Sequence, residues 1–460
     1  MSFVNNIVSF LPEVKGPDQK YLSFNQKLKW TSIILVSYFV MGVIPLYKLG
    51  QNELANFEFL SIILGAQFGS LISLGIGPIV TASIVLQLLN GSGILKLDTA
   101  THEGRVFFQG LQKVLSIFFI LFESLIYVFM GGLRPEIGSS PWTIVIQLVM
   151  GGILILYMDE VMNKWGFGSG VSLFIAAGVA SQIFISAFSP LSSAGDLAFG
   201  SGQAPVGRVF VMFTSLFKGL PQEALLAFLA IFATVLIFLI SVYVQSMKVE
   251  IPLSFGKIRG YGIRWPLKFI YTSNIPVILI AAFLANIQLW ATLLEKWGRP
   301  LLGTFVNGAP VSGFVLWIFP PNLFQNIFSG TFIFTDLARS LTYILFMVIG
   351  SVIFSIFWVQ TSGMDARSQA RQILNSGLQI PGFRRDERVL ERILKRYISP
   401  LTVMGAITVG FLASIADVMG ALSRGTGILL AVMIIYKLYE DIAQQHMMDI
   451  NPAFRKVIGK

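Results

Sequence analysis

Long apolar stretches separated by short polar loops run along nearly the whole chain. A helix needs about 20 apolar residues to cross a hydrocarbon core of ~30 Å, and ten charge-poor stretches approach that length. They cover residues 31–47, 71–89, 114–133, 142–158, 171–190, 225–246, 269–289, 341–359, 397–416 and 425–443. The pattern predicts an all-α polytopic membrane protein with ten transmembrane helices.

The region before the second stretch has an unusual pattern. Residues 57–66 (FEFLSIILGA) are apolar but too short to cross, and a series of glycines ends at Gly77-Pro78. One interpretation is a short re-entrant helix followed by a true span from about Leu74, because irregular backbone at membrane depth survives only inside protein or beside water. The other is a single helix kinked at its glycines.

A weak internal repeat divides the spans into two halves of five. The fifth span opens with Gly168-Ser169-Gly170 and the tenth with Gly425-Thr426-Gly427, while Pro78 and Pro276 lie near the starts of the second and seventh. Because five is odd, the second half must enter the membrane inverted relative to the first. Inverted repeats generally place a path or site at their interface.

The resulting organisation has five parts. We expect an N-terminal segment (1–30), a first five-helix half (31–190), a hinge loop (191–224), a second half (225–445) and a C-terminal tail (446–460).

Composition supports the membrane class. The chain is 55% hydrophobic and 12% charged, with a mean hydropathy of +0.75, whereas soluble proteins carry about 25% charged residues. It has no cysteine, which excludes disulfides, thiolate nucleophiles and cysteine-ligated metals. Its first thirty residues are too polar for a cleaved signal peptide.

Lysine and arginine are distributed unevenly between the two sides of the membrane. The terminal side, counting alternate loops, holds 24 of them and the opposite side 8. Cytoplasmic loops carry the excess of basic residues, so we expect a multi-pass protein of the cell membrane with both termini in the cytoplasm.

Chemistry-bearing motifs are scarce. The sequence contains no phosphate-binding loop of the Walker type, and His102 and His446 lie too far apart for a convincing metal pair. Glu123 is the one ionisable residue near the middle of a span. We therefore expect no enzyme activity, catalytic residue, metal or cofactor, and a driving force supplied by a partner.

Two loops carry more lysines and arginines than membrane orientation requires. Loop 361–396 carries eight lysines and arginines and loop 247–268 carries five. They could serve simple orientation or contact with anionic lipid, but phosphate-rich RNA is a natural target for such a surface.

Several long segments resemble the SecY family, most closely its archaeal branch. They are KLKW at 27–30, LGIGPIVTASIVLQLLNGSG at 74–93, GFGSGVSLFIAAGV at 166–179, YTSNIPVILIAAFLANIQLW at 271–290, KRYISPLTVMGAITVGFLA at 395–413 and GTGILLAV at 425–432. The resemblance implies the pore-forming subunit of a channel that passively translocates secretory polypeptides and releases transmembrane segments laterally into lipid. The alternatives are an inverted-repeat secondary transporter of a small molecule and a structural membrane scaffold.

The resemblance also implies specific sites. The family's constriction ring corresponds to Ile76, Val80, Val171, Ile175, Ile278 and Leu430, a ring of aliphatic tips that can exclude ions by dewetting. Its plug corresponds to about 54–70, with Phe57, Phe59, Leu60, Ile62 and Ile63 as the apolar face. The re-entrant interpretation of 57–66 is then preferred.

The remaining implied sites concern the lateral gate and the partners. The gate's polar cluster corresponds to Thr81, Glu123 and Asn274. The ribosome-binding residues correspond to Lys257, Arg259, Arg264, Arg384 and Arg385. Besides the ribosome, the implied partners are a SecE-type γ subunit, a small β subunit, signal sequences, nascent polypeptides and lipid.

Overall fold

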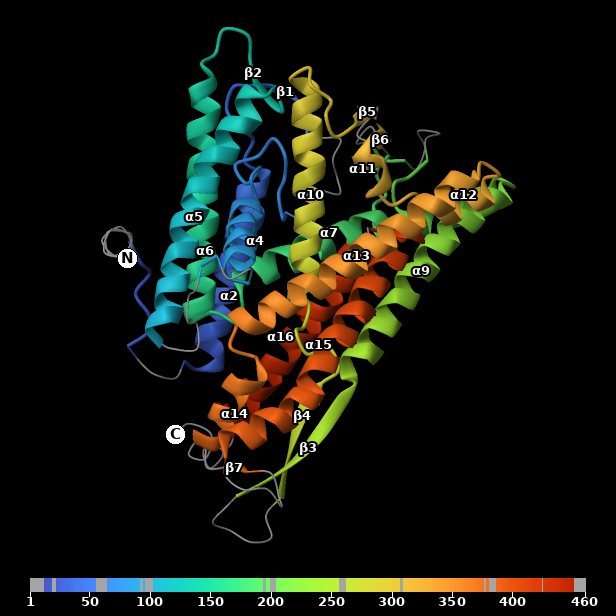
Figure 1. Ribbon diagram of the computed structural model, residues 1–460. Coiled ribbons are helices and arrows are strands. Elements are labelled where there is room, and N and C mark those ends of the chain that lie inside the picture. Colours follow the sequence, from blue (N-terminus) through green and yellow to red (C-terminus); the bar gives the residue numbers. More distant parts are fainter. Residues whose placement is uncertain are drawn as a thin grey trace.

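The fold is a bundle of long helices with small sheets at its two ends (Figure 1). The computed structural model describes residues 12–18, 22–54, 64–91, 94–95, 102–192, 196–198, 204–255, 262–306, 309–375, 378–379, 386–423 and 425–450.

Ten helices in the described ranges correspond in order to the ten predicted spans. They are α2 (Phe24–Val43), α4 (Gly77–Gly91), α5 (His102–Phe129), α6 (Pro141–Trp165), α7 (Gly170–Phe188), α9 (Pro221–Ser246), α10 (Ile275–Lys296), α13 (Phe334–Thr361), α15 (Glu387–Val418) and α16 (Gly425–Ile450). Seven of them are long and apolar enough to cross a membrane on length and composition alone. Of the other three, α4 is short, while α2 and α16 carry polar ends. The predicted fold class is confirmed.

Two of the helices begin later than the apolar stretches predicted. Residues 71–76 and 269–274 form turns, so that the helices start at Gly77 and Ile275 instead. In both cases a proline, Pro78 or Pro276, is the second helical residue. Proline has no amide hydrogen, so it fits easily in the first turn of a helix and is costly in its interior, where α15 nevertheless carries Pro400. A proline at the second position therefore favours a helix that starts just before it, which hydrophobicity alone does not indicate.

The predicted loops contain regular structure that hydropathy did not show. The hinge loop 191–224 holds α8 (Arg208–Phe217). Loop 247–268 is a hairpin of β3 (Lys248–Phe255) and β4 (Gly262–Lys268), paired in the register Lys248↔Lys268 and extended by β7 (Leu378–Gln379). Loop 361–396 holds α14 (Ala366–Asn375) and the start of α15.

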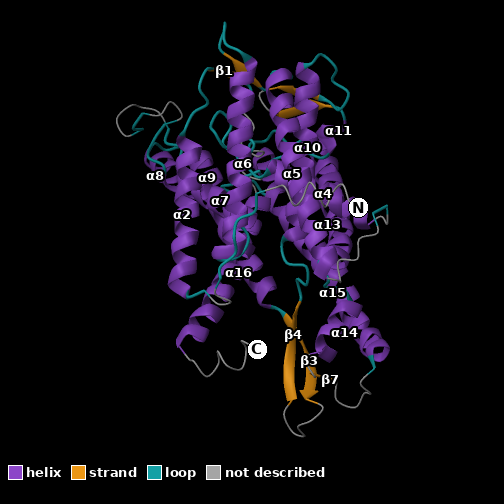
Figure 2. Cartoon of the chain, turned by 90° about the vertical axis from the view of Figure 1, so that its left-hand side faces the viewer, coloured by secondary structure: helices purple, strands orange, loops and turns teal. Residues whose placement is uncertain are grey.

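The two ends of the molecule carry different small elements. One end carries the sheet β4-β3-β7, α14 and the start of α15, and we call it the basic end. The opposite end carries β1 (Leu49–Asn52) paired with β2 (Leu133–Pro135), β5 (Thr304–Val306) paired with β6 (Ala309–Ser312), and the short helices α11 (Phe314–Trp317) and α12 (Leu323–Phe328). Figure 2 shows the basic-end hairpin projecting beyond the helices.

A single large apolar core joins the two halves of the bundle. Its buried members come from all ten of the long helices and from α11. Among the seven apolar helices, α10 is the most enclosed, because 72% of its most apolar 18-residue stretch is buried. The corresponding share in α9 is 28%. The exposed Phe228, Phe232 and Leu239 of α9 therefore fit a surface that faces lipid.

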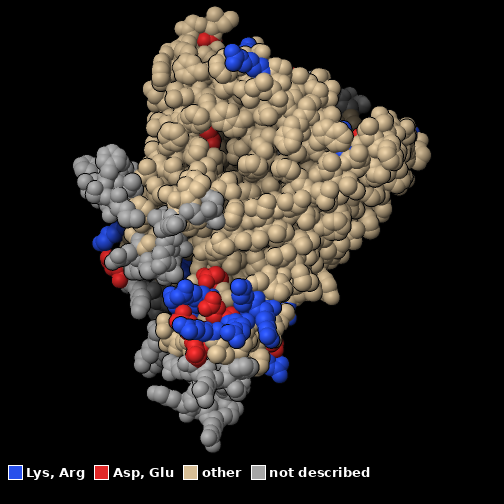
Figure 3. All heavy atoms as spheres, in the orientation of Figure 1, with Lys and Arg blue, Asp and Glu red and all other residues tan. Residues whose placement is uncertain are grey.

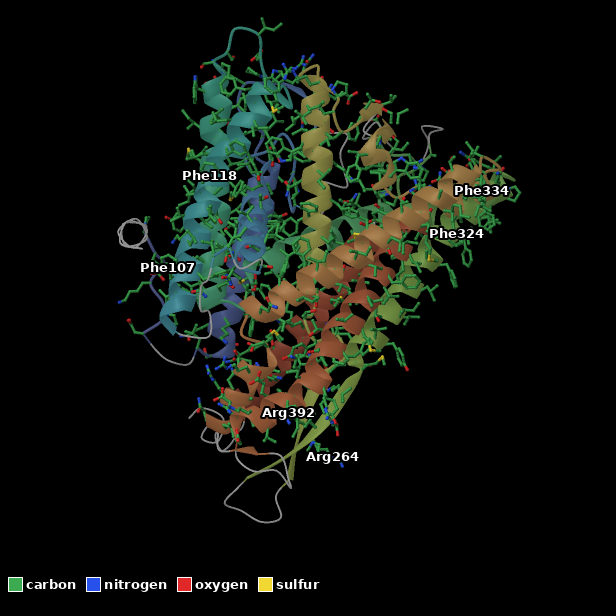
Figure 4. All side chains as sticks on the ribbon, in the orientation of Figure 1. Phe107, Phe118, Arg264, Phe324, Phe334 and Arg392 are labelled. Carbon is green, nitrogen blue, oxygen red and sulfur yellow. The ribbon has the colours of Figure 1, made fainter. Side chains whose placement is uncertain are left out.

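The charged side chains gather at the basic end. On the face drawn in Figure 3 they cluster below a broad zone of uncharged atoms, with a smaller basic group at the opposite end. Figure 4 labels Arg264 and Arg392 at the basic end, while the exposed Phe118 and Phe334 lie on α5 and α13. The uncharged zone between two polar ends is the arrangement that a bilayer requires.

Candidate functional site

The six residues of the expected ring all lie in or against the large apolar core. Five of them are at most 5% exposed and belong to the large apolar cluster, and Val171 packs against it. Ile76 directly precedes α4 and Val80 lies in its first turn; Val171 and Ile175 lie in α7, Ile278 in α10 and Leu430 in α16. Each half of the chain therefore contributes two helices to this part of the core.

Ile76 and Val80 keep their helical i,i+4 relation, although α4 begins only at Gly77. The amide of Val80 donates to the carbonyl of Ile76 at 3.0 Å, which is a helical i to i−4 bond. The two side chains are therefore one turn apart on the same side, as the i,i+4 spacing predicts.

The end of the expected plug segment is bonded directly to the ring. The carbonyl of Leu64 accepts from the amide of Ile76 at 2.7 Å, and Tyr38 Oη donates to the carbonyl of Gly65 at 2.8 Å. Asn52 Nδ2 donates to the carbonyl of Phe68 at 2.8 Å. The expected plug residues Phe57, Phe59, Leu60, Ile62 and Ile63 lie outside the described residues.

A glycine allows this close approach. Gly75 has a φ of +55°, which favours glycine. A Cβ at this position would overlap the carbonyl oxygen of Leu64. The chain therefore turns from the expected plug segment into α4 at a point where only glycine fits.

The polar cluster at the expected gate joins three helices. The Thr81 hydroxyl of α4 lies 3.3 Å from Glu123 Oε1 of α5, and it accepts from Asn286 Nδ2 of α10 at 3.2 Å. Glu123 is 4% exposed, and its Oε2 has no hydrogen-bond partner among the described residues. The seam between α4, α5 and α10 thus contains a small, partly buried polar bridge.

Asn274, the third expected gate residue, is not bonded to Thr81 or Glu123 in the part of the chain that the structure describes. It precedes α10, where its Oδ1 accepts from Ser273 Oγ at 3.0 Å, and its Nδ2 has no partner among the described residues. Twelve residues of helix span about 18 Å, so Asn274 and Asn286 lie at different levels of α10. Sequence reasoning missed Asn286, although a side-chain amide in the apolar stretch 269–289 was the available signal.

The expected ribosome-binding residues are only partly described. Arg264 of β4 pairs with Glu250 Oε2 at 3.0 Å and stays largely exposed. Lys257, Arg259, Arg384 and Arg385 lie outside the described residues.

Two further arginines stand close by at the basic end. Arg371 and Arg367 of α14 both approach Glu387 Oε1, at 2.8 and 3.6 Å. The hydrogen bond from Arg371 lowers the pKa of Glu387.

No cluster of three or more potential metal-ligating residues occurs in the part of the chain that the structure describes. His446 instead packs its ring against Phe24 at 5.5 Å between centroids.

Comparisons with known proteins cover almost the whole chain. A family model described as SecY matches residues 70–439. The chain is 45% identical to the protein translocase subunit SecY of Methanothermobacter thermautotrophicus over 457 residues, covering 98% of each chain. A solved structure described as a protein conducting channel superposes with a TM-score of 0.84 at 42% identity, covering 97% of this chain and 98% of the other. Sec61 from a canine ribosome-channel complex gives a TM-score of 0.81 at 42% identity, again covering 97% and 98%.

Proposed function

The chain belongs to the SecY family, and from that premise we propose that it forms the protein-conducting pore of a translocase. It conducts secretory polypeptides passively across the membrane and releases transmembrane segments laterally into lipid. In this role it has no enzymatic activity, and a bound partner supplies the driving force.

The burial of the ring residues in one apolar core supports the proposal. Five of the six aliphatic side chains are buried members of this core, Val171 packs against it, and the carbonyl of Leu64, in the segment that we assign to the plug, accepts from the amide of Ile76. An aliphatic neck excludes ions by dewetting and yet offers no fixed charge to a passing chain. We assign the ring to the pore constriction, the segment at about 54–70 to the plug, and the Thr81–Glu123–Asn286 bridge with Asn274 to the lateral gate.

Charge and two contacts support the orientation that we propose. Lys268 of β4 pairs with Glu440 of α16, and Gln445 Nε2 donates to the carbonyl of Leu22 at 2.8 Å. The start of α2 and the C-terminal part of α16 therefore lie beside the basic end. Because cytoplasmic segments carry the excess of basic residues, we infer that this end and both termini face the cytoplasm.

The partners follow from the family and from the basic end. A ribosome docks on the basic loops 247–268 and 361–396, through Lys257, Arg259, Arg264, Arg384 and Arg385. The canine relative comes from a ribosome-channel complex, and an exposed arginine such as Arg264 suits RNA phosphates. A SecE-type γ subunit and a small β subunit complete the complex.

Reconstitution tests the proposed function. The chain, with its γ and β partners, is placed in lipid vesicles and supplied with ribosomes bearing a nascent secretory precursor. We expect the precursor to become protected from added protease inside the vesicles, while a precursor with a charged residue in its signal sequence stays accessible. Equal exclusion of both precursors from vesicles that contain correctly folded complex would refute the channel function.

A further inference from the structure

An aspartate from the preceding span holds the start of α7. Asp159 Oδ1 of α6 accepts from the amide of Val171 at 2.9 Å, and the amide of Gly170 also donates to this carboxylate. Ser169, at the N-cap position, makes no side-chain capping bond. The first amides of α7 are therefore capped from another helix and not from its own N-cap residue.

The same arrangement occurs at the start of α16. Asp417, the penultimate residue of α15 and 2% exposed, accepts from the amide of Thr426 at 2.9 Å through Oδ1. Its Oδ2 accepts from the hydroxyl of Thr426 and from Tyr343 Oη of α13 at 2.6 Å. One carboxylate thus joins three helices of the second half.

Small residues bring each aspartate's helix close to the helix that it caps. A Cβ on Gly170 would lie 2.7 Å from the Cα of Asp159, and a Cβ on Gly425 would overlap Ala416. Both glycines are the first residue of their helix. The close approach lets a short aspartate side chain reach the amides beyond it, and the partial positive charge of the helix start favours the carboxylate.

The two bonds have the same register relative to the expected ring. Val171 and Thr426 are each the second residue of their helix, and Ile175 and Leu430 are each the sixth. The amide that the aspartate holds is therefore one helical turn before a ring residue on the same side of the helix. In the first half the residue held, Val171, is itself a ring position.

We propose that Asp159 and Asp417 are positioning residues for the constriction. Each fixes the level and the rotation of the helix that presents ring side chains, so that the neck stays closed to ions at rest. The inference rests on the proposed function and goes beyond it, since neither aspartate belongs to the expected ring, plug or gate.

The test replaces each aspartate in the complete complex with Leu and, separately, with Asn, and measures resting ion conductance in planar bilayers. We expect Asp159→Leu and Asp417→Leu to raise conductance several-fold, because the helix start loses its acceptor. Asn retains a side-chain oxygen for the same amide, and at position 417 its amide nitrogen can donate to the hydroxyls of Thr426 and Tyr343, which rotate to accept. Asp159→Asn and Asp417→Asn should therefore stay close to wild-type tightness. Rescue by Asn is an outcome that a role for the charge alone would not produce.

Asp336→Leu is the matched control. Asp336 is also buried and bonded, to Asn326 Nδ2 at 3.0 Å, but it lies at the start of α13 and holds no ring helix. Its loss should lower thermal stability without a leak. Wild-type tightness of both Asp→Leu variants, with helicity and thermal unfolding measured alongside, would overturn the positioning role, and so would an equal leak from Asp336→Leu.

A reference measurement separates this inference from the proposed function. In one reference variant, Ser replaces all three of Ile76, Ile175 and Ile278, and its resting ion conductance is measured. Protease protection of the precursor is measured with wild-type complex in vesicles. If the triple variant conducts ions at rest but the Asp→Leu variants do not, the positioning role is refuted while the ring remains the barrier to ions. Absence of precursor protection in wild-type vesicles refutes the channel itself.

Discussion

Val80 and Ile278 are each the fourth residue of a helix whose second residue is proline. Ile175 and Leu430 are also at equivalent positions, since each is the sixth residue of a helix that begins with glycine. The four positions thus form two pairs that the inverted repeat relates. Because inverted repeats place their shared site at their interface, a ring built from equivalent positions lies where the two halves meet.

The ring should be the barrier to ions at rest. Replacing Ile76, Ile175 and Ile278 together with Ser exposes hydroxyls in the neck, which favours water and removes the dewetting barrier. We expect resting conductance in planar bilayers to rise well above that of wild type. Ile144, Leu148 and Ile155 of α6 are equally buried, and single Ser substitutions there, as controls, should reduce stability without a leak. A triple variant as tight as wild type would remove the ring from the barrier.

Hydropathy predicts the helices of this fold but not their register. The ten apolar stretches locate all ten helices, yet Gly77 and Ile275 begin theirs several residues late, where a proline at the second position favours a helix start. The sequence alignment of Gly168-Ser169-Gly170 with Gly425-Thr426-Gly427 is also shifted by two residues from the structural equivalence of α7 and α16. In the structure Gly170 corresponds to Gly425, since both begin their helix.

Contacts between helices are what the sequence could not provide. Asn274 and Asn286 are both side-chain amides in one apolar stretch, and only tertiary packing decides which of them reaches Thr81. The hairpin β3–β4 was similarly hidden, because Lys and Arg at its exposed positions look like an ordinary polar loop. A resemblance to a family supplied the six ring positions, which single-residue hydropathy does not distinguish from lipid-facing residues.

Helix α6 packs closely against the turn before α4, so a larger residue at Gly151 should lower stability. A Cβ on Gly151 would overlap the carbonyl oxygen of Leu71, whereas a Cβ on Gly178 would lie 3.8 Å from Tyr38 Oη. Overpacking typically costs about 1–3 kcal/mol, so Gly151→Ala should lower the thermal unfolding temperature in detergent. Gly178→Ala should be neutral or slightly stabilising, because Ala is a better helix former than Gly. Equal behaviour of the two variants would contradict this packing.

An ion pair beside the plug segment should make stability depend on pH. Glu53 Oε2 accepts from Lys296 Nζ at 2.9 Å, and this hydrogen bond together with the lysine's charge lowers the pKa of Glu53 below its ordinary 4.5. A lowered folded-state pKa gives stability that is present above the unfolded value and is lost as pH falls through the folded value. We expect wild type to unfold at a higher temperature than Glu53→Gln at neutral pH.

The same comparison at low pH completes the test. The difference between wild type and Glu53→Gln should shrink as the pH falls below 4.5, the ordinary value, because protonated Glu53 no longer pairs with Lys296. Lys296→Met provides the control, since in that background Glu53→Gln should change little at any pH. A difference that persists unchanged in acid would mean that the pair does not contribute through its charge.

The polar bridge at the proposed gate should set how apolar a segment must be to open it. A hydrogen bond between membrane helices contributes only ~0.6 kcal/mol on average, so a leucine at position 286 could seal the seam at least as well and would resist wetting. Asn286→Leu should therefore raise the signal-sequence hydrophobicity needed for translocation. Asn274→Leu should act in the same direction, because it removes a buried amide whose Nδ2 has no partner among the described residues and which makes no side-chain cap to α10. Translocation into vesicles, measured against signal sequences of graded hydrophobicity, separates a shifted threshold from a uniform loss. A uniform loss in either variant would assign that asparagine to folding and not to the gate.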